Sequence, residues 1–410
     1  MADIRAFSCV RPRADLAERI AALPYDVYNR QEAKAEIARE PLSFLRIDRA
    51  ETNFDDSVDT YAPEVYEKAK ALLREMIEDG SFVKDGKSCY YVYELTMEGR
   101  AQTGLVACAS IDDYMGNIIK KHENTREEKE QDRICHVDVC NAQTGPIFLA
   151  YRAKDSIRQT VARVKDEKPV YDFLSPDGIR HAVWVMENES DIQTVSEAFA
   201  GMDSIYIADG HHRCASAVKV GLNRRQSHPG YDGTEEFNFF LAVLFPDEDL
   251  MIMPYNRVVK DLNGLSETEF MDKLSQRYEI ERRDTEVTPG HKGQVGMYLK
   301  GQWYLLTPKP ELISDDPVEG LDVSVLQNYV LSPILGIDDP RTDKRIDFVG
   351  GIRGNEELMR RVHTDMEVAF SMYPTSIQEL FEVADAGMLM PPKSTWFEPK
   401  LRSGIFIHEL

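Results

Sequence analysis

The chain has 410 residues, of which 42% are hydrophobic and 9% aromatic, so a largely disordered protein is excluded. This length exceeds what one core usually serves, and we expect two domains or one large domain with a subdomain. The 49 basic and 71 acidic residues give a net charge of −22, which argues against general nucleic-acid binding, because phosphate contacts need clustered positive charge.

The six cysteines form no Cys-x-x-Cys pair and show no zinc-ligand spacing, and several lie inside apolar runs. This usage is typical of reduced, mostly buried thiols in a cytoplasmic protein. The N-terminus has no apolar signal core, and no apolar run approaches the roughly 20 residues that cross a bilayer. We therefore expect a cytoplasmic protein without a membrane segment.

The first part of the chain is predicted to open with a strand and a proline-fixed extended turn at 23–28. Asn29 and Glu32 fit a capping box at the start of a helix. Tyr25 and Asp26 are either turn residues or polar groups aimed at a site. The pattern up to residue 111 predicts strands at 4–10, 44–47, 89–95 and 103–111, the last two as a hairpin, and helices at 29–39 and 63–78.

The segment 120–126, Lys-Lys-His-Glu-Asn-Thr-Arg, is a candidate for a polar site. A capping-box pattern starts a helix that runs to about 139, so His122 and Glu123 come to a helix N-terminus. A metalloprotease is disfavoured, because Arg126 stands where a zincin motif has its second histidine. A carboxylate among cations stays ionised and can accept a proton from a hydroxyl, so Glu123 is either a general base or part of an ordinary solvated loop.

The middle of the chain alternates strands and helices. The almost continuously apolar run 237–245 predicts a central strand that lies beside the buried strand at 205–208. A further strand at 250–259 is expected to close the main domain. The predicted elements here are strands at 147–151, 179–186, 205–208, 237–245 and 250–259, and helices at 154–165 and 189–199.

The stretch 204–218 joins the strand at 205–208 to a helix through the turn Asp209-Gly210. His211, His212 and Arg213 form the first turn of that helix. The free amides and positive dipole end of a helix N-terminus favour an anion, so these residues predict a site for a phosphate or a carboxylate. The plain alternative is that the histidines cap the helix and Arg213 pairs with a surface acid.

From about 262 the pattern becomes that of a smaller α+β unit. It predicts helices at 266–275, 291–298 and 323–331 and strands at 278–282 and 302–306. The tail 388–404 concentrates Lys393, Ser394 and Thr395 with two further cations in an otherwise acidic chain, which suits phosphate, although the tail could equally add a strand to the main sheet. The expected division is a main domain at 1–261, a smaller lobe at 262–387 and a segment at 388–410 that returns to the main domain.

Four motifs together resemble a widespread bacterial and archaeal family of uncharacterised proteins of about this length, over essentially the whole chain. They are Asp209-Gly-His-His-Arg213, Pro24-Tyr-Asp-Val27, His122-Glu-Asn-Thr125 and Met390-Pro-Pro-Lys-Ser-Thr395. The first also resembles the phosphate-binding turn of the ParB/sulfiredoxin superfamily, which implies a mixed α/β (α+β) main domain with a smaller lobe. His211 stands where sulfiredoxins have their catalytic cysteine, so sulfiredoxin chemistry is disfavoured.

The free-serine kinases of that superfamily carry the same Asp-Gly-His-His-Arg motif and use an upstream glutamate as base. This resemblance implies Glu123 as base, ADP or ATP as nucleotide with Mg²⁺, and a phosphoryl group held by Gly210, His211, His212 and Arg213. His122 and the Lys393-Ser-Thr395 segment would add to the binding site, and Asp209 would orient a histidine or hold a metal.

The leading hypothesis is therefore a phosphoryl-transfer enzyme, kinase or phosphatase, that acts on a small hydroxylated metabolite such as serine or phosphoserine. One alternative is a non-catalytic nucleotide or metabolite sensor of ParB type, although no helix-turn-helix is evident. The other is a metal-dependent hydrolase whose ligands are His122, Asp209, His211 and His212.

Overall fold

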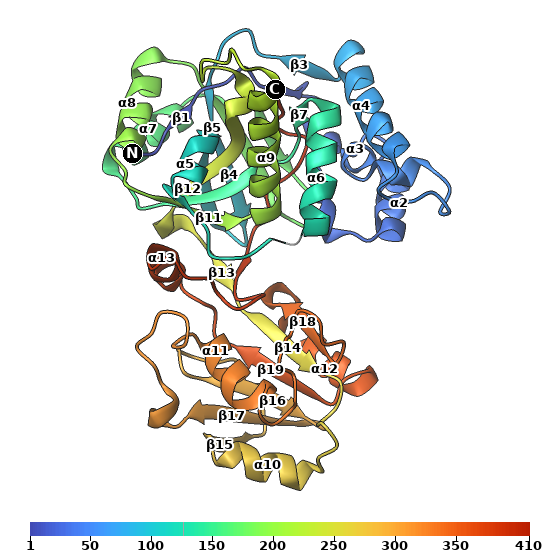
Figure 1. Cartoon of the computed structure of the whole chain (residues 1–410), viewed down its shortest axis with the longest axis vertical. Coiled ribbons are helices and arrows are strands. Elements are labelled where there is room, and N and C mark those ends of the chain that lie inside the picture. The colour runs from blue at the N-terminus through green and yellow to red at the C-terminus, as the bar shows by residue number, and fades with distance from the viewer. Residues whose placement is uncertain (126) are drawn as a thin grey trace. The chain divides into compact units, whose positions relative to one another are not determined.

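A computed structural model describes residues 1–125 and 127–410, and these form two compact units that are each described by themselves (Figure 1). Unit 1 comprises Met1–Leu250 and Pro399–Leu410, and unit 2 comprises Met251–Glu398. The division thus falls at 250 and 398, where the sequence patterns placed it at 261 and 387. Each unit combines a sheet with helices, so the α+β fold class is confirmed.

Unit 1 is built on one mixed sheet. Its described strands run in the order β6-β11-β8-β12-β5-β4-β10-β9, and β1 pairs with β5. The pairs β6–β11 and β8–β12 are parallel and the others are antiparallel. The strands are β1 (Ile4–Arg5), β4 (Tyr90–Met97), β5 (Arg100–Ser110), β6 (Ile119–Lys120), β8 (Ile147–Tyr151), β9 (Tyr171–Leu174), β10 (Arg180–Met186), β11 (Ile205–Asp209) and β12 (Phe239–Pro246).

The centre of this sheet is apolar on both faces. All of β8 is buried, as is β12 from Phe239 to Phe245, so burial of both faces explains why their sequences read as continuous apolar runs. The predicted central strand at 237–245 is thus confirmed as β12. The strand at 205–208, now β11, was predicted as its neighbour, and this is wrong, because β8 lies between β12 and β11.

Helices cover the sheet of unit 1, and two short strand pairs, β2–β3 and β7–β21, lie outside it. Figure 1 shows α6 and α9 side by side, and the two helices are in contact. The elements are α1 (Ala17–Ile20), α2 (Arg30–Arg39), α3 (Leu45–Asp48), α4 (Pro63–Glu78), α5 (Ile111–Met115), α6 (Glu127–Cys140), α7 (Asp155–Lys165), α8 (Glu189–Ala200), α9 (His211–Ser227), β2 (Val10–Pro12), β3 (Phe82–Lys84), β7 (Ala142–Gln143) and β21 (His408–Glu409).

Local sequence signals predicted several of these elements well. The capping box is present, since Asn29 accepts from the Glu32 amide and Glu32 from the Asn29 amide. Helix α4 has the expected bounds at 63–78, and β4 and β5 form the expected hairpin. All six cysteines are free and five are buried, as expected. No helix in the described part of the chain is both long and apolar enough to span a bilayer.

The strand predicted at 44–47 is wrong, because the chain forms helix α3 there. Phe44, Leu45 and Ile47 are fully buried in one apolar cluster with the inner face of α4. A four-residue apolar run is compatible with either a buried strand or a buried helical turn, so its pattern did not distinguish the two. The helix brings Asp48, which ends it, into the interior.

Unit 2 contains a six-stranded sheet in the order β15-β17-β16-β19-β14-β18 and a short pair, β13–β20. The strand predicted at 250–259 lies here as β13 and β14 and does not close unit 1, and the helix predicted at 291–298 is wrong, because Val295–Leu299 forms the buried strand β16. The elements are β13 (Ile252–Met253), β14 (Tyr255–Val259), β15 (Tyr278–Arg283), β16 (Val295–Leu299), β17 (Gln302–Pro308), β18 (Ile346–Gly350), β19 (Val368–Met372), β20 (Trp396–Phe397), α10 (Glu267–Ser275), α11 (Asp322–Leu326), α12 (Gly354–Thr364) and α13 (Ile377–Asp385).

Residues 399–410 rejoin unit 1 after the chain has formed unit 2. Ser403 bridges to Ala22, and Ile407 bridges to Val10 in the antiparallel sense. Strand β21 then pairs with β7. The returning segment is therefore fixed to unit 1 by backbone hydrogen bonds at three successive points.

Candidate functional site

The parallel pairing of β6 and β11 brings two distant parts of the sequence together. Ile119 is opposite Ile205 and Lys120 is opposite Tyr206, so both strands point in the same direction. Because the carboxyl ends of parallel strands meet at one edge of a sheet, the segment after β6 and the turn after β11 reach the same place. The first carries Glu123 and the second leads into α9.

Gly210 forms the turn between β11 and α9. Its φ of 89° is left-handed, a conformation that costs other residues roughly 1–2 kcal/mol. No side chain in the described residues caps α9, so the amides of its first turn keep the capacity to bind an anion. The Gly210 amide itself donates to Asp209 Oδ1 over 2.7 Å.

His211 lies between His122 and Glu123. The two imidazole rings meet edge to face, with centroids 4.5 Å apart. The His122 amide donates to His211 Nε2 over 3.4 Å, which leaves the His211 proton on Nδ1. That nitrogen lies 3.9 Å from Glu123 Oε2, which is longer than a hydrogen bond, so the Nδ1–H group faces the carboxylate as a neighbour.

Burial keeps the two imidazoles neutral. It lowers the pKa of His122 to about 4, against the opposing field of Asp209. Burial and then the His122 ring also hold the pKa of His211 well below its usual range. His122 is 2% exposed and His211 6%, whereas the Glu123 side chain is 42% exposed. The carboxylate is thus accessible, and the imidazole behind it is a neutral donor.

Asp209 forms an ion pair with Lys400 from the returning segment, with 2.8 Å between Oδ2 and Nζ. Desolvation alone would raise the pKa of Asp209, but Lys400 and Arg213 outweigh it and hold that pKa well below the ordinary range. The carboxylate therefore stays ionised. It contacts the Lys400 ammonium and the Gly210 amide, and the predicted role of orienting a histidine or holding a metal stays a prediction.

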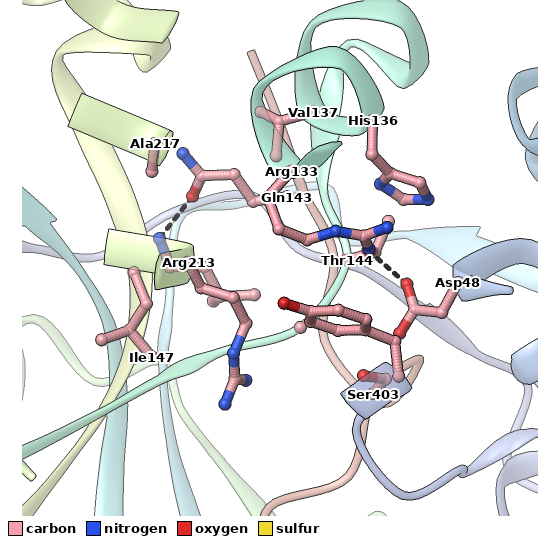
Figure 2. A pocket seen from close by; sticks show the side chains of 13 residues that line it. Asp48, Arg133, His136, Val137, Gln143, Thr144, Ile147, Arg213, Ala217 and Ser403 are labelled. Atoms are coloured by element: carbon pink, nitrogen blue, oxygen red, sulfur yellow. Dashed lines mark hydrogen bonds between the residues drawn. The ribbon is translucent and has the colours of Figure 1, made fainter. Parts of the chain in front are cut away.

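Arg213 projects from the first turn of α9 into a cavity that Asp48, Arg133 and His136 also line (Figure 2). Its Nη1 donates to the Pro146 carbonyl over 2.5 Å. Two glycines leave room for its guanidinium, since a Cβ on Gly210 would come within 3.1 Å of it and one on Gly145 within 3.6 Å. His212, on the same turn, is half-buried, and its carbonyl accepts from Ser216.

The three predicted tail residues belong to unit 2, where Lys393 and Ser394 make local contacts. The Lys393 ammonium lies 5.4 Å from the centre of the Tyr255 ring. Ser394 donates to the Pro391 carbonyl, and its own carbonyl accepts from Thr375. A phosphate-binding role for Lys393, Ser394 and Thr395 stays a prediction, while Lys400 of the same tail does reach the candidate site. Arg126 lies outside the described residues.

No group of three or more His, Cys, Asp or Glu side chains is arranged to hold a metal ion anywhere in the described ranges. Among the four residues predicted as metal ligands, Asp209 already forms an ion pair with Lys400. The His211 Nε2 lone pair accepts from an amide, so it is not directed at a cation. The metal-dependent hydrolase therefore gains no support from this arrangement.

Sequence reasoning missed the polar side chains that line the cavity beyond Arg213. Asp48 follows the apolar run that was misread as a strand, and Arg133 and His136 lie on α6. A usable signal was present, because Arg133 and His136 are three residues apart and so share a helix face. Both are buried, together with Asp132 on the same helix.

Comparison with known proteins places the chain in a family. No curated protein matches it. Among solved structures, a free serine kinase variant in complex with ADP is 14% identical over 75% of this chain and 93% of its own, with a TM-score of 0.36. A conserved hypothetical protein from Pyrococcus furiosus is 14% identical over 74% and 94%, with a TM-score of 0.35, and C-terminally truncated SbnI from Staphylococcus aureus is 12% identical over 72% and 82%, with a TM-score of 0.38. The model of the family described as protein of unknown function (DUF1015) matches residues 4–324, and the chain belongs to that family.

Proposed function

We propose that this protein is a phosphoryl-transfer enzyme, a kinase or a phosphatase, that acts on a small hydroxylated metabolite such as serine or phosphoserine. The observation that carries the proposal is the contact between Glu123 and His211 at the N-terminus of α9, with 3.9 Å between Oε2 and Nδ1. It sets an accessible carboxylate beside a helix end that favours anions. General base catalysis and phosphate binding need these two features side by side.

Glu123 is the proposed base. In a kinase, the substrate hydroxyl oxygen forms the new bond to phosphorus, the bond to the leaving nucleotide oxygen breaks, and the hydroxyl proton passes to Glu123. In a phosphatase, water takes the place of the hydroxyl. His211 Nδ1 faces the carboxylate at 3.9 Å, and we assign this buried, neutral ring a positioning role in which it donates to Glu123 when the substrate binds.

The negative charge of the phosphoryl group is met by groups other than His122 and His211. Since His122 and His211 are neutral, the amides of α9, Arg213 and Lys400 supply the positive potential. A nucleotide donor would bring Mg²⁺ on its own phosphates. The Gly210 turn holds the helix end open for this anion.

Turnover assays test the proposal directly. We expect the full-length protein to consume ATP, ADP or CTP in the presence of serine, or to release phosphate from phosphoserine. Glu123→Gln should lower turnover about 10²- to 10⁴-fold and leave the melting temperature almost unchanged, because the side chain is half exposed. Glu128→Gln, an exposed change on the neighbouring α6, is the matched control. Absence of both turnover and a melting-temperature rise across this panel would contradict the proposal.

A second candidate is a nucleotide or metabolite sensor without chemistry. It is favoured by one observation, the burial of His122 and His211 as neutral rings, which removes two candidate cations from the site. In that case wild type and Glu123→Gln should bind nucleotide with equal affinity, and neither should show turnover.

A further inference from the structure

Arg257 of unit 2 is a buried cation that has no acidic partner. Arg133 and Arg402, the other buried arginines of the described chain, are each ion-paired with an aspartate. By contrast, no carboxylate of the described residues forms an ion pair with Arg257, and burial lowers the pKa of Arg257 to about 10. The guanidinium is therefore charged at neutral pH and lacks a counter-ion, although the chain has 71 acidic residues.

Two backbone carbonyls hold the Arg257 guanidinium in place. The side chain extends from β14, which lies between β18 and β19 (Figure 1). Nη1 donates to the Tyr255 carbonyl, and Nη2 donates to the Lys393 carbonyl over 3.1 Å. Nε donates to no acceptor among the described residues and is not sealed from solvent. The carbonyls satisfy two donors but leave the positive charge to be neutralised by another group.

Lys393 lies beside this arginine in a strained turn. Its φ of 60° is left-handed, a conformation that favours glycine. Besides the Arg257 contact, the Ser394 hydroxyl donates to the Pro391 carbonyl over 2.6 Å. The Thr375 hydroxyl donates to the Ser394 carbonyl over 3.0 Å. Three hydrogen bonds thus hold a lysine where glycine would fit more easily, and strain of this kind is typical of positions where the side chain serves a function.

The Lys393 ammonium is the second cation of this cluster. It lies 5.4 Å from the centre of the Tyr255 ring, and Tyr255 is two residues from Arg257 on β14, so these two side chains leave the same face of the strand. The guanidinium lies 5.4 Å from the centre of the Phe348 ring, which is 5.9 Å from that of Tyr255. Within the described ranges Lys393 has no ion-pair partner either. Two cations on one aromatic surface repel each other unless an anion joins them.

We infer that unit 2 binds the phosphate group of a small molecule, or inorganic phosphate, between Arg257 Nε and the Lys393 ammonium. Such a group carries a charge of about −2 at neutral pH, which matches two cations, whereas a carboxylate matches only one. The arginine supplies a fixed, planar donor and the lysine a compact charge on a flexible stem. The inference goes beyond the proposed function, because it concerns unit 2 alone and uses neither Glu123 nor His211.

Phosphate titration of the full-length protein tests the inference. Calorimetry should detect binding of inorganic phosphate, and acetate, a monoanion, should bind at least about tenfold more weakly. Lys393→Met should weaken phosphate binding by a similar factor. Lys300→Met is the matched control and should bind like wild type, since Lys300 is also an exposed lysine of unit 2 with a left-handed φ of 46°. Equal isotherms for the two variants, or no binding by wild type, would overturn the inference.

Selenate separates this site from the head of α9, where the proposed function also places phosphate. It is a dianionic oxyanion whose selenium scatters X-rays anomalously. In soaked crystals of the full-length protein, a peak should lie within hydrogen-bond distance of Arg257 Nε and Lys393 Nζ. Lys393→Gly should remove this peak and still fold, because glycine favours the left-handed turn. A peak at α9 alone would refute the inference and leave the proposed function standing, whereas a peak in unit 2 alone would support the inference and count against phosphate binding at α9.

Discussion

Glu123 Oε2 lies 3.9 Å from His211 Nδ1, and the amide of His122 fixes the other nitrogen of that ring. Two consecutive residues after β6 thus contact the same imidazole, one through the main chain and one through the side chain. The amide contact sets the tautomer of His211, so that its Nδ1–H group faces the carboxylate. The position of the carboxylate at the head of α9 is therefore a property of the fold.

Gly210→Ala should cost stability and also disturb Arg213. The left-handed turn alone costs about 1–2 kcal/mol for alanine, and the new methyl group would meet the guanidinium. Gly178→Ala is the control, because Gly178 has a similar φ of 79° but open space around it. Both variants should melt earlier, and only Gly210→Ala should lose affinity for phosphate or ADP in a titration. Equal affinities in the two variants would refute a role for this turn.

Lys400→Met should destabilise unit 1 by about 1–2 kcal/mol at neutral pH, because it removes the ion pair of the half-buried Asp209 carboxylate. Partial exposure and the remaining field of Arg213 keep the loss this small. Since the folded pKa of Asp209 is lowered, the stabilisation is present above the ordinary carboxyl pKa and is lost as pH falls through the folded value. Urea midpoints of wild type and variant should therefore converge in acid. Lys34→Met, which removes an exposed ion pair, should have the smaller effect at every pH. A difference between the urea midpoints of wild type and Lys400→Met that stays constant down to the lowest pH would argue against the Asp209–Lys400 ion pair.

His122 should make folding stability fall between pH 6.5 and about 4. In this window the unfolded imidazole binds a proton that the buried one excludes, since its folded pKa is about 4. The loss amounts to about 3 kcal/mol at most for this one group. Chemical denaturation at several pH values should show a shallower acid slope for His122→Asn, whereas His228→Asn at an exposed position should keep the wild-type slope. Identical slopes in all three proteins would mean that His122 is not buried as a neutral ring.

The sequence predicts most elements whose signals are local. The capping box at Asn29, the amphipathic face of α4 and the turn at Gly210 each depend on residues a few positions apart. For the same reason the Asp209-Gly-His-His-Arg213 segment could be placed correctly at a strand-to-helix turn. These interactions form within one element and need no knowledge of the rest of the chain.

The remaining features depend on pairing between distant segments. Strand β6 has only two residues, so its parallel pairing with β11, which brings Glu123 to His211, leaves no periodic signal. The Lys400 contact to Asp209 spans most of the chain. Asp48 was missed because the short apolar run before it fits a strand as well as a helix.

The return of residues 399–410 to unit 1 has a consequence for biosynthesis. Lys400 and the residues that bridge to Ala22 and Val10 are translated only after the whole of unit 2. While the nascent chain grows, unit 2 can therefore complete its contacts first. Until Lys400 is translated, the Asp209 carboxylate lacks this ion-pair partner. Ribosomes that stall within unit 2 would yield a polypeptide with every residue of the Asp-Gly-His-His-Arg turn but without the cation that neutralises it.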